Sequence, residues 1–141
     1  MKYHRKHNCI NFRMTRVLLV EDSEDVLYLM RLQLEWMGYV VETASNAAAA
    51  LETAKKVVPD VIVSDLRMPE MDGFELIRRI RSIRSLAFVP AIALTGAGTD
   101  ADISQAIASG FTAHVMKPVE TSELSKTIEQ LTMPQVRRKA S

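Results

Sequence analysis

The sequence has one cysteine, Cys9, among its 141 residues. No disulfide can form within the chain, which fits a protein of the reducing cytosol. No apolar stretch approaches the roughly 18–20 residues that a membrane span requires, and the N-terminus lacks the apolar core of a secretion signal. We therefore expect a cytoplasmic protein without a membrane span.

Acidic residues are missing from both ends of the chain. Residues 1–13 carry four basic side chains and residues 132–141 carry three. Setting these seven aside leaves 11 basic against 17 acidic residues, a net charge of −6 for the part between. An acidic body with basic ends argues against direct nucleic-acid binding by the fold. We expect a disordered leader at 1–13, one domain at 14–132 and a basic flexible tail at 133–141.

Short apolar runs alternate with longer helical patterns, which is typical of buried parallel strands joined by helices. The runs are at 16–20, 39–43, 61–64, 91–94 and 113–116, and the helical segments are at about 23–37, 46–58, 74–82, 101–109 and 121–131. Ser23 and Thr121 are expected to cap the first and last helices. The order predicts the α/β class, with a doubly wound five-stranded parallel sheet and five helices.

Four of these runs lead directly into side chains that carry chemistry. These side chains are Glu21 and Asp22 after the first run, Asp65 after the third, Thr95 after the fourth and Lys117 after the fifth. Because the functional crevice of such a sheet lies at the carboxyl ends of its strands, we expect all five in one site.

Three carboxylates at one sheet edge repel one another unless a cation lies between them. Glu21, Asp22 and Asp65 offer the hard oxygen ligands that suit Mg²⁺. An aspartate beside Mg²⁺ can act as a nucleophile and form an aspartyl phosphate. The Lys117 ammonium and the Thr95 hydroxyl would then contact phosphoryl oxygens. Singly, each residue is more often a cap or a solvated side chain, but five at four strand ends favour phosphoryl transfer.

The segments VLLVEDSED, VIVSDLRMPEMDGFEL, AIALTG and VMKP resemble, in this order, the signature segments of bacterial response-regulator receiver domains of the chemotaxis-regulator type. The resemblance covers about 16–131 and implies a flavodoxin-like (βα)5 fold. It implies that Asp65 accepts a phosphoryl group from a histidine kinase or histidine phosphotransfer protein. It also implies that Asp22, Asp65 and the Arg67 carbonyl bind Mg²⁺, with Glu21 acting directly or through water.

The resemblance assigns the remaining site residues as well. Thr95 is implied to move toward the phosphoryl group and Lys117 to bridge to it, with a cis Lys117–Pro118 bond. Three positions depart from the commonest pattern. Glu21 stands in place of an aspartate, and His114 stands where many receivers carry a tyrosine or phenylalanine that switches inward. Arg67, two residues after Asp65, shields the phosphoryl group from water, attracts the donor, or points to solvent.

The helix at 23–37 is unusually apolar. One predicted face belongs to the core and contains Val26, Met30, Leu34 and Met37. A second stripe contains Tyr28, Leu32 and Trp36. These three either fold onto neighbouring helices, stand as isolated surface residues, or dock the phosphodonor, as the corresponding helix commonly does in receivers.

Several functions compete at this point. We expect a phosphoacceptor signalling domain and no metabolic enzyme, acting as a monomer or weak homodimer. Its downstream protein target is expected to bind the face formed by the segments 101–109, 113–116 and 121–131. An aspartyl-nucleophile phosphohydrolase would need a second acid at Arg67, and a DNA-binding factor would need residues beyond the last helix. A pseudo-receiver, a binding module that is never phosphorylated, would not need the carboxylates Glu21, Asp22 and Asp65.

The segment GFTAHVMKPVETSEL further resembles receivers attached to hybrid sensor kinases. This resemblance favours a phosphorelay intermediate or a hybrid-kinase receiver over a stand-alone regulator. The cognate kinase, the output partner and the stimulus have no signature in the sequence.

Overall fold

The computed structural model of the chain describes residues 14–96 and 99–133. Within them the elements follow one another as β1 (Arg16–Val20), α1 (Glu24–Trp36), β2 (Val40–Ala44), α2 (Ala47–Lys56), β3 (Val61–Asp65), α3 (Gly73–Arg81), the 3₁₀ turn η2 (Arg84–Leu86), β4 (Ala91–Thr95), α4 (Asp100–Ser109), β5 (Ala113–Met116) and α5 (Thr121–Thr132). The predicted leader at 1–13 and, apart from Met133, the predicted tail lie outside the described residues.

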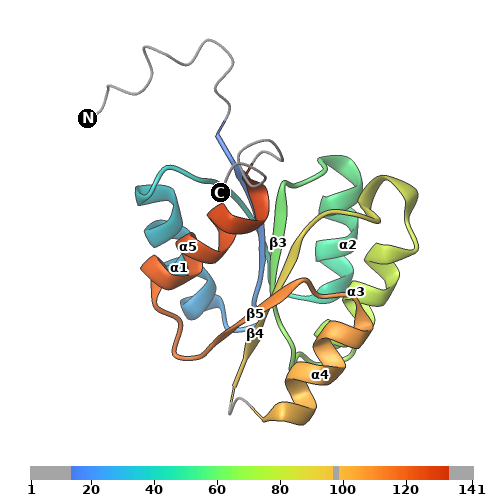
Figure 1. Cartoon of the computed structure of the whole chain (residues 1–141). Coiled ribbons are helices and arrows are strands. Elements are labelled where there is room, and N and C mark those ends of the chain that lie inside the picture. The colour runs from blue at the N-terminus through green and yellow to red at the C-terminus, as the bar shows by residue number, and fades with distance from the viewer. Residues whose placement is uncertain (1–13, 97–98, 134–141) are drawn as a thin grey trace.

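The five strands form one sheet in the order β2-β1-β3-β4-β5, and every neighbouring pair is parallel. Helices α1 and α5 cover one face of this sheet, and α2, α3 and α4 cover the other (Figure 1). The predicted doubly wound α/β fold is thus confirmed. The strand order reverses between β1 and β3, which places the expected crevice at the carboxyl ends of these two strands.

Each face of the sheet has its own apolar core, because successive strand residues point to opposite sides. In β1, Leu18 and Val20 belong to the core beneath α2 and α3, whereas Val17 and Leu19 belong to the core beneath α1 and α5. All residues of β3 and β4 are buried. This burial on both faces explains why these strands are continuous apolar runs in the sequence.

The buried face of α1 differs from the predicted one. Leu27, Met30 and Leu34 are buried, whereas Val26 and Met37 are 42% and 44% exposed. Met30 and Leu34 are buried as predicted, so the buried face is turned toward Leu27 and away from Val26 and Met37 by less than one residue step. Leu27 and Val26 both fit a helical apolar spacing with Met30 and Leu34, so the sequence pattern could not separate them.

Thr121 does not cap α5 as predicted. The N-cap is Glu120, without a side-chain hydrogen bond, and the Thr121 hydroxyl donates to Oε1 of Gln33 at 2.8 Å. This bond joins the start of α5 to α1, so tertiary contact replaces the local cap. The Ser23 prediction is confirmed, because its hydroxyl accepts from the Val26 amide.

Arg81 fastens the end of α3 to two neighbouring loops. Its guanidinium donates to the Gly110 carbonyl at 3.0 and 2.9 Å and to the carbonyls of Leu86 and Ala87 at 3.2 Å. Gly110 ends α4 with φ of 132°, a conformation that L side chains rarely adopt.

Among the described residues, no helix combines the length and apolarity needed to cross a bilayer.

Candidate functional site

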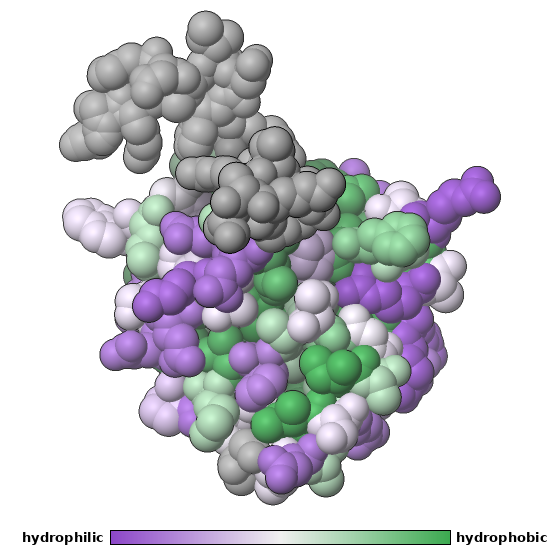
Figure 2. All heavy atoms as spheres, in the orientation of Figure 1, coloured by the Kyte–Doolittle hydropathy of each residue, from purple (hydrophilic) through white to green (hydrophobic). Residues whose placement is uncertain are grey.

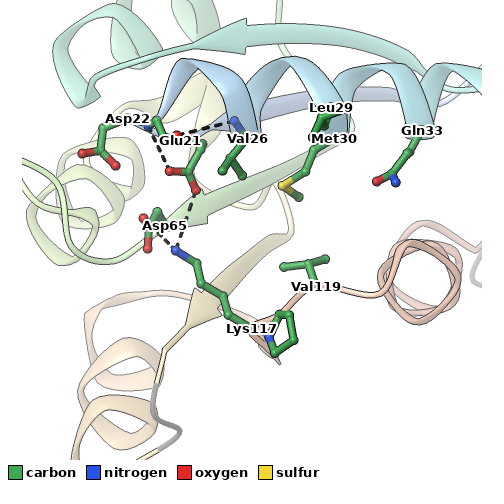
Figure 3. Close-up of a pocket in the computed structure, with 11 residues that line it drawn as sticks. Glu21, Asp22, Val26, Leu29, Met30, Gln33, Asp65, Lys117 and Val119 are labelled. Atoms are coloured by element: carbon green, nitrogen blue, oxygen red, sulfur yellow. Dashed lines mark hydrogen bonds and ion pairs between the residues drawn. The ribbon is translucent and has the colours of Figure 1, made fainter.

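The predicted site residues meet at the carboxyl edge of the sheet. Asp65 is the last residue of β3 and Thr95 the last of β4, while Glu21 and Lys117 directly follow β1 and β5. Lys117 extends toward Asp65 and Glu21 beside α1 (Figure 3). The topology therefore brings together residues that are up to 96 positions apart, as expected from the strand ends.

Three carboxylates form the acidic part of the site. Glu21, Asp22 and Asp65 each offer an oxygen, and these oxygens all lie within 4.8 Å of one another. Glu21 is 3% and Asp65 6% exposed, whereas Asp22 is exposed. Burial raises the pKa of the Glu21 carboxyl and the charge of Asp65 raises it further, against the opposing effect of the Ser23 amide 3.0 Å away. The cluster thus concentrates negative charge in a poorly solvated place.

Lys117 neutralises part of this charge. Its Nζ lies 3.0 Å from Oδ2 of Asp65 and 3.7 Å from Oε1 of Glu21. Its backbone amide donates to the Thr95 carbonyl at 2.8 Å, which holds the ends of β4 and β5 together. The Lys117–Pro118 bond is cis, as expected. Three carboxylates and one ammonium leave the site with an excess of negative charge.

The acidic residues fit a bound metal ion. Among the described residues, Oε1 of Glu21 is a buried oxygen without a hydrogen-bond partner. Its nearest positive charge is the Lys117 ammonium at 3.7 Å, too far for a hydrogen bond, and a hard cation between the three carboxylates would coordinate it directly. Glu21, Asp22 and Asp65 can therefore hold a metal ion.

Two buried polar atoms lie on the strands next to this cluster. Thr95 is fully buried, and its Oγ1 has no hydrogen-bond partner among the described residues. Nδ1 of His114 on β5 is also buried and unpaired within the described part of the chain. Both residues thus have unused hydrogen-bonding capacity in the conformation seen here.

The turn after β3 is fixed by a close backbone approach at Gly73. A Cβ at this position would lie 2.3 Å from the Asp65 carbonyl oxygen and 2.9 Å from Cα of Leu66. The Gly73 amide donates to the Leu66 carbonyl at 2.9 Å, and Asp72 caps α3 by accepting from the Glu75 amide. The start of α3 therefore presses against the segment that carries Asp65, a contact that sequence spacing did not reveal.

Arg67 is held by a partner that the sequence did not indicate. Its Nη2 lies 2.6 Å from Oδ1 of Asp102 in the first turn of α4. Its guanidinium also lies 5.5 Å from the centre of the Phe74 ring. The side chain is 67% exposed to solvent, but it is tied to α4 by this ion pair. Asp102 is 35 residues away in sequence, so no local pattern could have paired the two.

The second stripe of α1 is exposed. Tyr28, Leu32 and Trp36 are 55%, 41% and 90% exposed. Beside the acidic cluster, a cavity of about 580 Å³ lies between α1 and the segment Lys117–Val119. Its apolar wall includes Val26, Leu29 and Met30 (Figure 3). Sequence reasoning had assigned Val26 to the core and passed over Leu29, which is 57% exposed.

Residues 17–129 match the profile of the response regulator receiver domain. The chain belongs to the receiver domain family. Receiver domains are signalling domains of two-component systems, and they accept phosphoryl groups from histidine kinases or phosphotransfer proteins. A phosphoacceptor role of this receiver is consistent with its family and with its acidic cluster.

Relatives of this receiver agree with the match. An uncharacterized 14.6 kDa protein of Leptolyngbya boryana is 42% identical over 114 residues, which are 81% of this chain and 87% of that protein. The structure of chemotaxis protein CheY4 of Vibrio cholerae has a TM-score of 0.81 and 34% identity over 84% of this chain and 99% of that one. The chain spans 42% to 50% of the length of several transcriptional regulators that it also matches.

A solved receiver from a sensor histidine kinase is also similar. The receiver domain of PA1611 of Pseudomonas aeruginosa has a TM-score of 0.80 and 27% identity over 86% of this chain and 100% of that one. That structure has a magnesium ion coordinated in its active-site cleft. The receiver described here thus resembles both chemotaxis and sensor-kinase receivers in fold.

Proposed function

We propose that Asp65 is the phosphoacceptor of this receiver and that its donor is a phosphohistidine of a histidine kinase or histidine phosphotransfer protein. The observation that carries this proposal is the convergence of Asp65 with Lys117 at 3.0 Å inside a cluster of three carboxylates. A carboxylate oxygen of Asp65 attacks the phosphorus atom, and the phosphorus–nitrogen bond of the donor breaks. The electron pair of that bond goes to the imidazole nitrogen, and an acyl phosphate forms on Asp65.

The metal site is proposed to be specific for Mg²⁺. Glu21, Asp22 and Asp65 supply carboxylate oxygens, and the Arg67 carbonyl completes the ligands from the chain. When bound, Mg²⁺ offsets the charge that builds up on phosphoryl oxygens during transfer. Support comes from the Glu21 oxygen that accepts no hydrogen bond and from the magnesium ion in the similar PA1611 receiver. Without a cation, the cluster would repel an incoming phosphoryl group.

Lys117 and Thr95 are proposed to contact oxygens of the phosphoryl group carried by Asp65. The Lys117 ammonium, already next to Asp65, is placed to pair with a phosphoryl oxygen after transfer. The Thr95 hydroxyl has no partner among the described residues and is free to donate to another phosphoryl oxygen. Movement of Thr95 would open space beside β5, and we propose that His114 responds as the second switch residue.

The phosphodonor is proposed to dock on the exposed stripe of α1 beside the site. Tyr28, Leu32 and Trp36 offer exposed aromatic and aliphatic surface, and Trp36 is 90% exposed. Aromatic residues are often the main contributors to binding energy at protein interfaces. Changing Tyr28 and Trp36 together to alanine should slow transfer from the kinase by about tenfold or more and leave acetyl phosphate labelling unchanged.

Phe88 provides the matched control for this docking test. It is 96% exposed and precedes β4. It therefore lies near the amino ends of the strands, whereas the acidic cluster lies at their carboxyl ends. Phe88→Ala removes a comparable exposed ring and should transfer at the wild-type rate. Equal slowing of both donors in the Tyr28 and Trp36 variant would contradict docking on α1.

The output of the receiver is proposed to pass through the face formed by α4, β5 and α5. Figure 2 shows hydrophobic side chains among polar ones over α4 and β5. Ile107 of α4 and Met116 of β5 are 47% and 50% exposed. A downstream protein could bury these side chains when the switch residues move. Such a partner fits a stand-alone regulator, a phosphorelay intermediate or a receiver of a hybrid kinase.

Intact mass after incubation with acetyl phosphate tests the proposal. The wild type should gain one phosphoryl group in the presence of Mg²⁺ and none after chelation. Asp65→Asn should gain none under either condition, whereas Asp25→Asn, which removes an exposed acid of α1 outside the metal cluster, should behave as the wild type. Labelling of the Asp65 variant, or labelling independent of Mg²⁺, would refute the assignment.

A further inference from the structure

Helix α4 has little apolar burial at its start. All ten of its residues are described, and Ala106 alone among them is buried. Asp102 and Ile103 are half-buried, and the other residues before Ala106 are exposed. By contrast, α3 buries five of its nine residues. Because helices in proteins are stabilised mainly by packing of an apolar face, the first turns of α4 depend on few contacts.

The Arg67–Asp102 ion pair is a direct tie between this weakly packed turn and the phosphorylation site. The two side chains approach to 2.6 Å, and Asp102 is 23% exposed. The Phe74 ring, 5.5 Å from the Arg67 guanidinium, supports the arginine from the side of α3. The pair therefore connects the loop after β3 with the start of α4.

Arg67 is placed to sense a change at Asp65. Its backbone amide lies 3.5 Å from Oδ1 of Asp65. Phosphorylation would add a group with a charge of about −1.5 to −2 and three strong acceptor oxygens at this carboxylate. The phosphoryl group would compete for the Arg67 guanidinium with Asp102, which carries a single negative charge. Once released, Asp102 remains in the first turn of α4, where a negative charge is favoured by the helix dipole.

We propose that the Arg67–Asp102 ion pair is a latch that holds the start of α4 while Asp65 is unmodified. Phosphorylation of Asp65 draws the Arg67 guanidinium to the phosphoryl oxygens and releases the first turns of the helix. This regulation rests on the proposed function of Asp65. It differs from the switch proposed for Thr95 and His114, because it acts through an ion pair outside the sheet.

Amide hydrogen exchange of the full chain, read by mass spectrometry, tests the latch. Peptides covering 99–106 are compared before and after phosphorylation with acetyl phosphate and Mg²⁺. In the wild type, phosphorylation should speed their exchange about two- to fivefold, the range expected for loss of an exposed ion pair. Asp102→Asn should show this faster exchange before phosphorylation and little further change after it.

Asp100→Asn is the matched control. It removes an equal charge from the same helix turn, and the described structure shows no ion pair at Asp100. Its exchange should follow the wild type before and after phosphorylation. If Asp100→Asn also exchanges as fast as Asp102→Asn before phosphorylation, helix-end charge explains the effect and the latch is refuted.

Exchanging the two charges separates a latch from a merely structural ion pair. The double variant Arg67→Glu with Asp102→Arg should restore slow exchange in the unmodified protein. Its acidic side chain at position 67 is repelled by a phosphoryl group, so phosphorylation should leave exchange slow. Release of α4 in this variant would overturn the latch. The intact mass of each sample shows whether Asp65 was phosphorylated; a wild type that gains no phosphoryl group refutes the proposed function and the latch with it.

Discussion

Replacing Gly73 by alanine should force a methyl group into the backbone that carries Asp65. The new Cβ would lie 2.3 Å from the Asp65 carbonyl oxygen, 2.9 Å from Cα of Leu66 and 3.2 Å from the Asp65 carbonyl carbon. All three are backbone atoms, so no side-chain rotation relieves the overlap. The end of β3 and the start of α3 must therefore move apart, and Asp65 must move with them.

The cost of this movement can be worked out approximately. Overpacking costs about 1–3 kcal/mol, and the upper end applies because the obstacle is main chain. Alanine in place of glycine in the middle of a helix returns about 0.5–1 kcal/mol, and Gly73, the first residue of α3, recovers at most this amount. The free energy of unfolding should thus fall by about 2 kcal/mol. The free energy of unfolding of a small protein falls by about 1–3 kcal/mol for each molar of urea, so the urea midpoint should fall by about 1 M.

Urea unfolding, with Mg²⁺ absent and present, measures both consequences of Gly73→Ala. Beyond the lower midpoint, the variant should gain less stability from Mg²⁺, because Asp65 is displaced from Glu21 and Asp22. Gly96→Ala is the control, since a Cβ there meets no described atom within 4 Å and no positive φ opposes it. Its free energy of unfolding should stay within about 0.5 kcal/mol of the wild type, with a midpoint close to that of the wild type. Equal midpoints for the two variants would refute the close-approach reasoning.

Three further changes should give measurable results. Asp22→Asn should abolish the rise in thermal stability with Mg²⁺, about 1.4 kcal/mol for the wild type at tenfold over Kd. Tyr39→Phe should lower the free energy of unfolding by about 1–2 kcal/mol, since it breaks the buried 2.7 Å hydrogen bond to Ser125. Hydrogen bonds from Arg79 and Arg78 lower the pKa of Glu75, so Glu75→Gln should flatten the loss of stability as pH falls below about 4.5.

Ionisation of Tyr39 should also make the free energy of unfolding depend on pH in the alkaline range. Burial raises the pKa of Tyr39 above its ordinary value of 10.0. Its contribution to stability is therefore complete below pH 10 and is lost as pH rises through the higher value of the folded state. Urea unfolding across this range should show a steeper loss for the wild type than for Tyr39→Phe. Parallel curves would contradict the buried, hydrogen-bonded tyrosine.

Sequence reasoning located the elements well because strand periodicity and glycine or proline stops are local signals. The runs at 16–20 and 113–116 coincide with β1 and β5, and β2 is shifted by one residue. The predicted buried face of α1 was wrong at Val26 because its neighbour Leu27 also fits a helical spacing with Met30 and Leu34. The cap at Thr121 was wrong because its hydroxyl bonds to another helix, which no local pattern records.

The site was predictable for the same topological reason. Asp65 and Lys117 follow the ends of parallel strands, and such ends share one edge of a sheet. What could not be predicted depends on atoms that meet across the fold. The 2.6 Å approach of Arg67 to Asp102 and the backbone contact at Gly73 follow from how α3 and α4 sit against the sheet. Neither has a signature in residue spacing.

The two ends of α4 are held to different degrees, because the Arg81 guanidinium binds the backbone at the last turn. Gly110, just past the last turn, accepts two hydrogen bonds from this side chain, which also grips the loop before β4. We therefore expect any displacement of α4 to be largest in its first turns, because the end at Gly110 is held by these hydrogen bonds. A partner protein that binds α4 would therefore distinguish the two states of the receiver mainly by contacts with the first turns, at the end nearest Asp65.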